Sequence, residues 1–463
     1  MECKRVACLG AGFVGGPTMA VFASKCPDIH FTVLDIDSSK IDQWNSNNLP
    51  IYEPNLYEII QPVRGQNLFF STNIIEEIEA ADMIFFSLPT PTKKQGLGAG
   101  SACDLSYFEQ AVRNVATILT KYKGFKIIVE KSTVPVRTAE MVKEILTCNC
   151  KELEFSVLSN PEFLAEGSAV NDLLFPNRVL IGGDNMQAIT ALFMLYAKWV
   201  PSDRIITTSL WSSELAKLCS NAMLAQRVSS INSISALCEK VGADVEDVAR
   251  VLTKDERIGS KFLQTSIGFG GSCFKKDILC LVYLCENVGL SEVAEYWRQV
   301  IVMNEFQTNR YCRVISKMLV NLKMKNIAIF GFAYKKNTSD TRESPSAYVC
   351  NSLLQEEAIL HIFDPKVTRQ QMLAEMNFHE FLDGISSEKH LISHSDPYVA
   401  VKNTCAIVVL TEWDIFKNLN YESMYAEMQK PAFIFDGRNV LNHKALKRVG
   451  FKVVAIGKSE FCI

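Results

Sequence analysis

The chain has 463 residues, 48% of them hydrophobic, and a formal net charge of −3 at pH 7. This length exceeds what one compact core accommodates, so two or three domains are expected. The near-neutral charge excludes a general nucleic-acid-binding protein, and no apolar run is long enough to span a bilayer.

Fifteen scattered cysteines and no charged-then-apolar leader predict a cytoplasmic protein with free thiols. No pair of C-x-x-C motifs recurs at zinc spacing, so we expect no metal. His390 and His394 are four residues apart, but no acid or cysteine pattern accompanies them. A solvated surface helix is the better interpretation of that pair.

The chain opens with a predicted strand at 5–9, the glycines Gly10, Gly12 and Gly15, a helix, and a strand at 31–35 that ends in Asp35. Strand, glycine turn, helix, strand and acid together indicate a dinucleotide-binding fold. The helix start faces the pyrophosphate, and Asp35 binds the ribose hydroxyls. Because a carboxylate repels a 2′-phosphate, NAD is favoured over NADP. The alternative is a glycine turn in an unrelated α/β sheet.

Further strands are predicted at 83–88, 126–130, 155–158 and 178–182, with helical patterns such as 105–121 between them. This alternation favours a mainly parallel sheet covered on both faces. Polar segments follow three of these strands and include Thr90, Ser132 with Thr133, and Glu162 with Glu166. Ligands of open α/β sheets bind at such strand ends. A serine and a threonine before Val-Pro can also be a helix cap.

Strand signals stop between about 210 and 320. A long helix capped by Ser212 or Ser213 is predicted to reach Gly242, and further helices are predicted at 245–252, 274–288 and 292–320. Lys217 and Asn221, four residues apart, share a face of the long helix. Taken alone, Lys217 is better read as one solvated lysine among many.

Strands return at 325–331, 359–363, 405–410, 432–435 and 452–456. The turn after the first of them contains lysines and lacks the three glycines, so it suits a nucleotide phosphate better than a second dinucleotide. We therefore expect two Rossmann-like doubly wound α/β domains joined by a central helical domain. The expected bounds are 1–209, 210–323 and 324–463.

Cys273 follows a glycine turn at the predicted start of a helix, with Asp277 one turn later on the same face. Helix starts favour a thiolate over a thiol, and a thiolate beside a carboxylate suits covalent chemistry on a carbonyl. A nicotinamide-dependent oxidation can produce that carbonyl. A core cysteine is the plain alternative for this residue.

The chain resembles the UDP-glucose 6-dehydrogenases, within the UDP-glucose/GDP-mannose dehydrogenase family of nucleotide-sugar dehydrogenases. The resemblance spans nearly all of residues 3–457. The motifs that carry it include Gly-Ala-Gly-Phe-Val-Gly-Gly-Pro, Leu-Pro-Ile-Tyr-Glu-Pro, Glu-Lys-Ser-Thr-Val-Pro-Val, Leu-Ser-Asn-Pro-Glu-Phe-Leu-Ala-Glu-Gly, Trp-Ser-Ser-Glu-Leu-Ala-Lys-Leu, Gly-Phe-Gly-Gly-Ser-Cys-Phe-Lys-Lys-Asp, Asp-Thr-Arg-Glu-Ser and Phe-Asp-Gly-Arg.

The resemblance implies oxidation of UDP-glucose to UDP-glucuronate with reduction of two NAD, through thiohemiacetal and thioester intermediates on Cys273. It implies that Lys217 stabilises charge on the substrate oxygen or moves its proton. Asp277 then supports the lysine and the hydrolytic water, and Asn221, Thr133 and Glu162 surround that water. It also implies self-association into dimers, which assemble into a hexamer.

The resemblance further implies two sets of binding residues. The cofactor set is Gly10, Ala11, Gly12, Phe13, Val14, Gly15, Asp35, Lys40, Thr90, Pro91, Thr92, Ser132, Thr133, Glu166, Lys276 and Arg342. The substrate set is Glu162, Phe163, Leu164, Ala165, Glu166, Lys217, Asn221, Arg257 from a neighbouring subunit, Gln264, Ser266, Gly268, Phe269, Gly270, Tyr334, Lys335 and Arg438.

The sequence departs from the family pattern in the cofactor region. Leu88 and Pro89 replace the usual Val-Asn, and Lys40 stands where an arginine is common, which affects cofactor affinity more than chemistry. Three alternatives remain open. They are another nucleotide-sugar dehydrogenase of the GDP-mannose or UDP-N-acetylhexosamine type, a two-electron dehydrogenase, and a non-catalytic UDP-sugar-binding protein.

Overall fold

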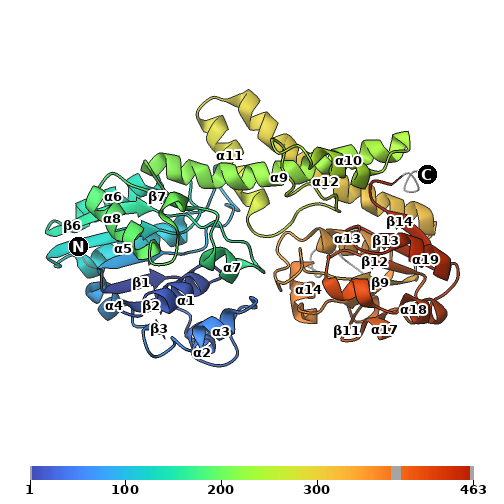
Figure 1. Cartoon of the computed structure of the whole chain (residues 1–463), viewed down its shortest axis with the longest axis horizontal. Helices are drawn as coiled ribbons and strands as arrows, with labels where there is room; N and C mark the ends of the chain where they lie inside the picture. The colour runs from blue at the N-terminus through green and yellow to red at the C-terminus, as the bar shows by residue number, and fades with distance from the viewer. Residues whose placement is uncertain (1–2, 377–386, 459–463) are drawn as a thin grey trace. The chain divides into compact units, whose positions relative to one another are not determined.

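The computed structural model describes residues 3–376 and 387–458, which form two compact units. The first unit comprises Met1–Ser220 and Leu279–Gly289, and the second comprises Asn221–Ile278 and Leu290–Ile463. Each unit is built around one sheet (Figure 1).

The sheet of the first unit has eight strands in the order β3-β2-β1-β4-β5-β6-β7-β8. Their bounds are β1 Arg5–Leu9, β2 His30–Leu34, β3 Leu68–Ser71, β4 Met83–Phe86, β5 Gly124–Glu130, β6 Leu153–Ser159, β7 Val179–Gly182 and β8 Ile205–Thr208. All neighbouring strands pair in parallel except β6 and β7. The carboxyl ends of β1, β4 and β5 therefore meet at one edge, as expected of a doubly wound fold.

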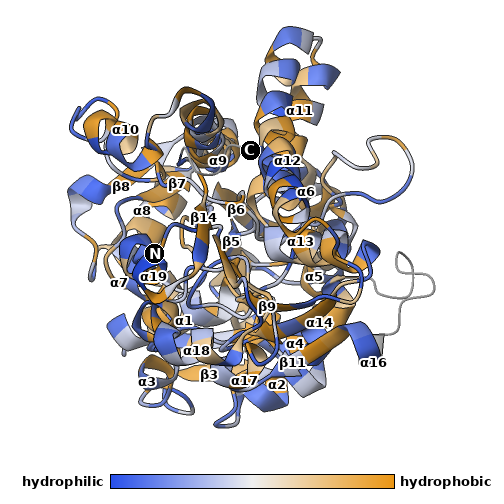
Figure 2. Cartoon of the chain, turned by 90° about the vertical axis from the view of Figure 1, so that its right-hand side faces the viewer, coloured by the Kyte–Doolittle hydropathy of each residue, from blue (hydrophilic) through white to orange (hydrophobic). Residues whose placement is uncertain are grey.

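Two apolar clusters cover this sheet, one on each face. Successive β4 residues alternate between them, with Phe85 in one cluster and Ile84 and Phe86 in the other. The covering helices are α1 Gly15–Lys25, α2 Ser38–Trp44, α3 Leu56–Ile60, α4 Ile74–Ala80, α5 Ser106–Leu119, α6 Thr138–Asn149, α7 Ala169–Leu174 and α8 Met186–Tyr196, with a short 3₁₀ helix, η1, at Ser202–Arg204. In Figure 2 much of the strands is orange, the colour that marks hydrophobic residues.

Four helices follow in the chain: α9 Leu210–Val241, α10 Val245–Leu252, α11 Phe274–Asn287 and α12 Ser291–Leu319. Helices α9 and α11 each contribute residues to both units. Helix α9 begins at Leu210, so the prediction that Ser212 or Ser213 caps it is wrong. The Ser209 hydroxyl oxygen accepts a hydrogen bond from the Ser212 N–H instead (3.3 Å).

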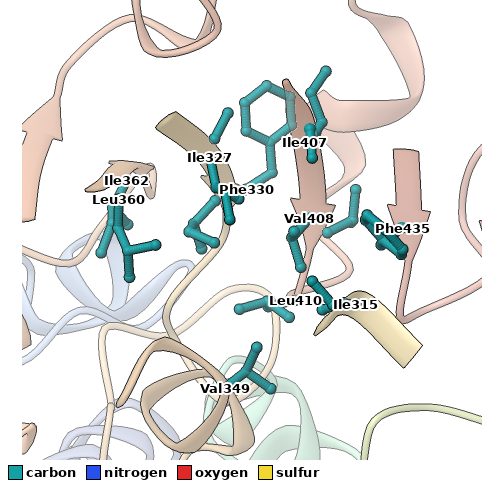
Figure 3. Packing of buried hydrophobic residues seen from close by; sticks show 14 of the residues in the cluster. Ile315, Ile327, Phe330, Val349, Leu360, Ile362, Ile407, Val408, Leu410 and Phe435 are labelled. Carbon is teal, nitrogen blue, oxygen red and sulfur yellow. The ribbon is translucent and has the colours of Figure 1, made fainter. Parts of the chain in front are cut away.

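The sheet of the second unit has six parallel strands in the order β11-β10-β9-β12-β13-β14. Their bounds are β9 Asn326–Phe330, β10 Ile359–Phe363, β11 Leu391–His394, β12 Ala406–Val409, β13 Phe433–Asp436 and β14 Lys452–Ala455. Its helices are α13 Pro345–Gln355, α14 Arg369–Glu375, α16 Ser387–His390, α17 Pro397–Ala400, α18 Tyr421–Glu427 and α19 His443–Val449, with the 3₁₀ helix η2 at Asp414–Asn418. Figure 3 shows Ile327, Val408 and Phe435 from the central strands packed with Ile315 and Val349.

This architecture confirms the predicted fold class, two Rossmann-like sheets with a helical middle that contains a long helix. The sequence prediction missed β3, β8 and β11. It also placed His394 on a surface helix, which is wrong because His394 ends the edge strand β11. There its Nε2 lies 3.0 Å from Nδ1 of His361, and the two rings stack.

Candidate active site

The turn after β1 has the geometry that a dinucleotide needs. Gly10 has a φ of +106°, and a Cβ there would lie 2.1 Å from the Ser87 carbonyl oxygen. A Cβ at Gly15 would lie 2.0 Å from the Gly10 oxygen, whereas one at Gly12 would meet nothing within 4 Å. Open space beside Gly12, at the start of α1, leaves room for a pyrophosphate.

Asp35 lies directly after β2 and joins the glycine turn to the next loop. Its carboxylate accepts hydrogen bonds from the N–H groups of Ala11 (3.0 Å) and Asp37 (3.1 Å) and from the Lys40 ammonium (3.0 Å). Burial raises the pKa of Asp35, but these donors outweigh burial, and its pKa is lowered overall. Asp35 is therefore an anion at neutral pH, able to accept from ribose hydroxyls and to repel a 2′-phosphate.

Two hydroxyl groups connect the loops that follow β4 and β5. The Ser132 hydroxyl accepts from the Leu88 N–H (2.8 Å) and contacts the carbonyl oxygens of Phe86 and Leu88. The Thr90 hydroxyl donates to the Thr133 carbonyl oxygen (2.8 Å). These bonds hold the predicted cofactor segment Thr90, Pro91 and Thr92 beside the end of β5.

A buried ion pair connects the segment after β6 to α9. The Lys217 ammonium lies 3.0 Å from Oε1 of Glu162, and their side chains are 3% and 8% exposed. Within the described chain, Oε2 of Glu162 is buried without a hydrogen-bond partner. A carboxylate with one free oxygen beside an ammonium can accept a proton or hold a water molecule.

Arg178 is a residue of this region that the sequence prediction missed. Its guanidinium carbon lies 3.9 Å from the centre of the Phe163 ring, and Nζ of Lys217 lies 5.3 Å from the same centre. Arg178 also donates to the Ser220 hydroxyl (3.4 Å), one turn along α9 from Lys217. A cavity of about 60 Å³ adjoins Arg178, Glu162, Phe163 and Leu164. No local motif marks Arg178, because its partners are distant in the sequence.

In the second unit, Cys273 directly precedes α11, as predicted, and its side chain is exposed. The Asp277 N–H donates to the Cys273 carbonyl oxygen (2.9 Å), which closes the first turn. The Asp277 carboxylate is buried and accepts from Nδ2 of Asn221 (2.6 Å) and from Nζ of Lys276 (2.7 Å). The structure thus brings Asp277 and Asn221 together, one helix turn after the thiol.

The loop before Cys273 is held against α12 by Asn304. Its side chain accepts from the Phe269 N–H (2.8 Å) and donates to the Phe269 carbonyl oxygen (3.0 Å). Asn232 of α9 likewise accepts from the N–H of Ser266 (2.9 Å). The sequence prediction missed both asparagines, since each acts on a loop more than 30 residues away. Gln264, in the same loop, is exposed.

The glycines of this loop lie against the segments after β9. A Cβ at Gly271 would lie 2.7 Å from the Tyr334 ring, and the Gly271 N–H donates to the Arg342 carbonyl oxygen (3.0 Å). The Arg438 guanidinium donates to the Tyr334 carbonyl oxygen (3.0 Å). The predicted residues Tyr334, Arg342 and Arg438 are thus close to the Cys273 loop.

Lys335 and Arg257, two further predicted substrate-binding residues, also belong to the second unit. Nζ of Lys335 lies 5.4 Å from the centre of the Tyr334 ring. The Arg257 side chain is 90% exposed and pairs with Asp255 (2.6 Å). An exposed guanidinium of this kind is available to a neighbouring molecule.

Among residues 3–376 and 387–458, no group of three or more His, Cys, Asp or Glu residues could hold a metal ion. The helices within these ranges also include none that combines the length and the hydropathy of a membrane span.

Models of one protein family match three successive parts of the chain. The NAD binding domain of the UDP-glucose/GDP-mannose dehydrogenase family matches residues 4–200, its central domain matches 211–306, and its UDP binding domain matches 328–443. The chain belongs to the UDP-glucose/GDP-mannose dehydrogenase family. The predicted family and the predicted NAD cofactor are therefore confirmed.

Named members of this dehydrogenase family match the chain over nearly its whole length. UDP-glucose 6-dehydrogenase 3 of Oryza sativa subsp. japonica is 53% identical over 98% of this chain and 97% of its own. UDP-glucose 6-dehydrogenase of Mus musculus is 52% identical over 99% of this chain and 94% of its own. A UDP-glucose dehydrogenase structure from Pyrobaculum islandicum has a TM-score of 0.85 at 27% identity and covers 99% of this chain and 98% of its own.

Proposed function

We propose that this chain oxidises UDP-glucose to UDP-glucuronate with the reduction of two NAD. Relatives named UDP-glucose 6-dehydrogenase are 51–53% identical to this chain over at least 94% of their own length. The observation that carries the proposal is the exposed Cys273 thiol at the start of α11, four residues before the buried Asp277 carboxylate. An enzyme that oxidises an alcohol only to an aldehyde has no use for such a thiol.

Each oxidation releases a hydride, and bound NAD supplies the acceptor. The C6 alcohol loses the hydride and its hydroxyl proton, which leaves an aldehyde. The Cys273 thiolate then adds to the carbonyl carbon, and the oxygen takes a proton to give a thiohemiacetal. Loss of a second hydride and of the hydroxyl proton gives a thioester. Water adds to the thioester carbon, the C–S bond breaks, and the carboxylate and the thiolate are released.

The buried polar groups have roles in these steps. Lys217, held by Glu162, donates to the oxygen that gains negative charge in the additions, and one such donor commonly contributes about a hundredfold to a thousandfold in turnover. Asp277, Asn221 and Thr133, with Glu162, position the hydrolytic water. The structure supports this proposal by pairing Asn221 with Asp277.

The cofactor and substrate residues predicted from the sequence complete the proposal. Support for the cofactor set comes from the open space at Gly12 and from the Asp35 carboxylate beside Lys40. For the substrate set, it comes from the Arg438 guanidinium, which donates to the carbonyl oxygen of Tyr334. We also propose that the domain bounds are 1–209, 210–323 and 324–463, which the three family matches support.

The chain is further proposed to self-associate as dimers that assemble into a hexamer, and to act in the cytoplasm. Exposed apolar side chains on α9 and α12 support self-association. Leu237, Val241, Val302 and Phe306 are all at least 40% exposed. In a dimer, Arg257 of one subunit is proposed to reach the substrate of the other.

Counting the NADH formed per UDP-glucose consumed tests the reaction. Two NADH and one UDP-glucuronate are expected for each UDP-glucose, measured by absorbance and chromatography on one sample. One NADH per product would indicate a two-electron dehydrogenase, and none from folded protein would indicate a binding protein. Faster turnover of GDP-mannose or a UDP-N-acetylhexosamine would move the chain to another branch of the family.

A further inference from the structure

The Tyr-Glu-Pro motif at 52–54 lies far in the sequence from the candidate catalytic residues, yet its glutamate contacts one of their loops. The Glu53 side chain is buried, with 6% of the residue exposed. Its Oε2 accepts from the Gly167 N–H and its Oε1 from the Ala169 N–H, each at 2.7 Å. Hydrogen bonds this short to an ionised carboxylate are among the stronger ones in proteins.

Both donors sit where the loop after β6 turns into α7. Gly167 has a φ of +82°, and Ala169 is the first residue of α7. The Asp172 carboxylate accepts from the Ala165 N–H (3.0 Å) and the Ser168 hydroxyl (2.9 Å), so it ties the loop to α7 itself. Glu53 instead ties the loop and α7 to the segment before α3.

Helix α1 packs against both α3 and α7. This helix begins at Gly15, at the end of the glycine turn. The Glu53 carboxylate therefore joins two segments that rest on the helix facing the cofactor phosphates. Glu162 and Glu166 lie within five residues of Gly167, so a displacement of the loop relative to α1, α3 and α7 also moves these two glutamates.

We propose that Glu53 is a positioning residue that fixes the loop bearing Glu162 and Glu166. The inference rests on the proposed function of these two glutamates. A carboxylate can accept from both N–H groups at once. A glutamine has one oxygen and one NH₂ group, so it leaves one buried N–H facing another donor. A misplacement of about 1 Å can cost about a hundredfold in rate.

Glu53→Gln tests the proposal. We expect kcat at saturating UDP-glucose and NAD to fall at least about tenfold, at temperatures well below unfolding. The matched control is Asp82→Asn. Asp82 also accepts from two distant backbone N–H groups, those of Lys4 (2.8 Å) and Arg5 (3.0 Å), but both donate to its Oδ2, and they lie at the amino ends of β1 and β4, away from the ligand edge. This control is expected to keep the parental kcat.

Amide hydrogen exchange provides a readout independent of turnover. In Glu53→Gln, peptides that cover Ala165–Ala169 should exchange at least about tenfold faster, and peptides from the second unit should not change. Faster exchange with unchanged kcat would mean that Glu53 only caps α7, and would overturn the proposal. Unchanged exchange would overturn the contact itself. Should Glu53→Gln fail to fold, Glu53→Asp, which keeps the charge on a shorter side chain, is measured in its place with the same criteria.

Glu162→Gln separates failure of this inference from failure of the proposed function. Unchanged kcat in Glu162→Gln would contradict the proposed role of Glu162 and leave the exchange result for Glu53 standing. A large loss in Glu162→Gln with parental kcat in Glu53→Gln would overturn only the positioning role.

Discussion

Cysteine reactivity in this chain is decided by the surroundings of each thiol. Burial raises the pKa of Cys8 to about 12 and that of Cys312 to about 11, so these thiols stay protonated and unreactive. Cys273 is exposed and directly precedes α11, and the partial positive charge of a helix start favours a thiolate. Exposure and helix position together single out this sulfur as the nucleophile of the proposed reaction.

Cys273→Ser should retain binding of both ligands and lose the ability to form UDP-glucuronate. Without a thioester leaving group, we expect product formation to fall by about a thousandfold or more. Binding is measured by calorimetry and product by chromatography. Cys148→Ser is the matched control, because Cys148 is also exposed but follows no glycine loop. Turnover of Cys273→Ser within tenfold of the parent would contradict a covalent role.

At the scale of single residues, sequence reasoning identifies groups that belong to compact motifs. The three glycines, Asp35 and the Cys273 segment could be predicted because their spacing alone carries the chemistry. Glu53 contacts Gly167 across 114 residues, and Asn304 contacts Phe269 across 35. Side chains of this kind act on backbone groups that only the folded chain brings near.

At the scale of elements, a pair of buried carboxyl groups links β5, α6 and α9. Glu130 is the last residue of β5, and Glu214 lies on α9. The Glu214 carboxylate accepts from the N–H groups of Arg137 (2.8 Å) and Ala139 (2.9 Å) and so caps α6. Burial, and then the charge of Glu214, raises the pKa of Glu130 well above its usual range, and burial also raises the pKa of Glu214.

This pair predicts that Glu130→Gln stabilises the protein at alkaline pH. A carboxyl group whose pKa is raised on folding binds more protons in the folded chain than in the unfolded one. The unfolding free energy of the parent therefore falls as pH rises above about 4.3, the ordinary pKa of glutamic acid. Glutamine removes this loss while it can still donate to Glu214. At pH 8 the variant should melt at least about 2 °C higher than the parent, by scanning calorimetry.

The advantage of Glu130→Gln should shrink toward pH 4, where the two carboxyl groups of the parent become mostly protonated in the unfolded chain as well as in the folded one. Glu154→Gln, at an exposed position of β6, is the control and is expected to leave the pH profile of melting unchanged. A constant difference between Glu130→Gln and the parent from pH 4 to pH 8 would contradict the explanation by a raised pKa of Glu130.

Elements with strong internal patterns were predictable, and those defined by partners were not. Helix α10 occupies 245–252, as its apolar periodicity predicts, and the strand at 359–363 is also confirmed. Strand β11, Leu-Ile-Ser-His, has no apolar run because it lies at a sheet edge. The start of α9 was misplaced because Ser209, Ser212 and Ser213 are equally good caps in sequence, and only the fold selects Ser209.

At the scale of the whole molecule, the division into units crosses helices that the sequence presents as continuous. Helices α9 and α11 each contribute to both units, although each reads as one uninterrupted pattern. Composition and strand signals predict where sheets begin and end. They do not predict which unit the two ends of a helix join, because packing over long sequence distances decides that.

The final prediction concerns the proposed dimer. Leu237 and Val241 lie one turn apart near the end of α9, and they are 61% and 66% exposed. Exposure of these apolar side chains to water is unfavourable, and a partner surface that covers them would remove this free-energy cost. A chain with both residues changed to Glu should elute as a smaller species in size-exclusion chromatography with light scattering. It should also lose UDP-glucose turnover at least about tenfold, because Arg257 is then not supplied by a neighbour.

Ile75→Glu, on α4 of the first unit, is the matched control, since Ile75 is also 60% exposed and its position carries no proposed interface. This control should keep the parental mass and turnover. A parental mass for the Leu237 and Val241 variant would place the dimer surface elsewhere on the chain. A monomer with full turnover would show instead that each active site is complete within one chain, and Arg257 would lose its proposed role.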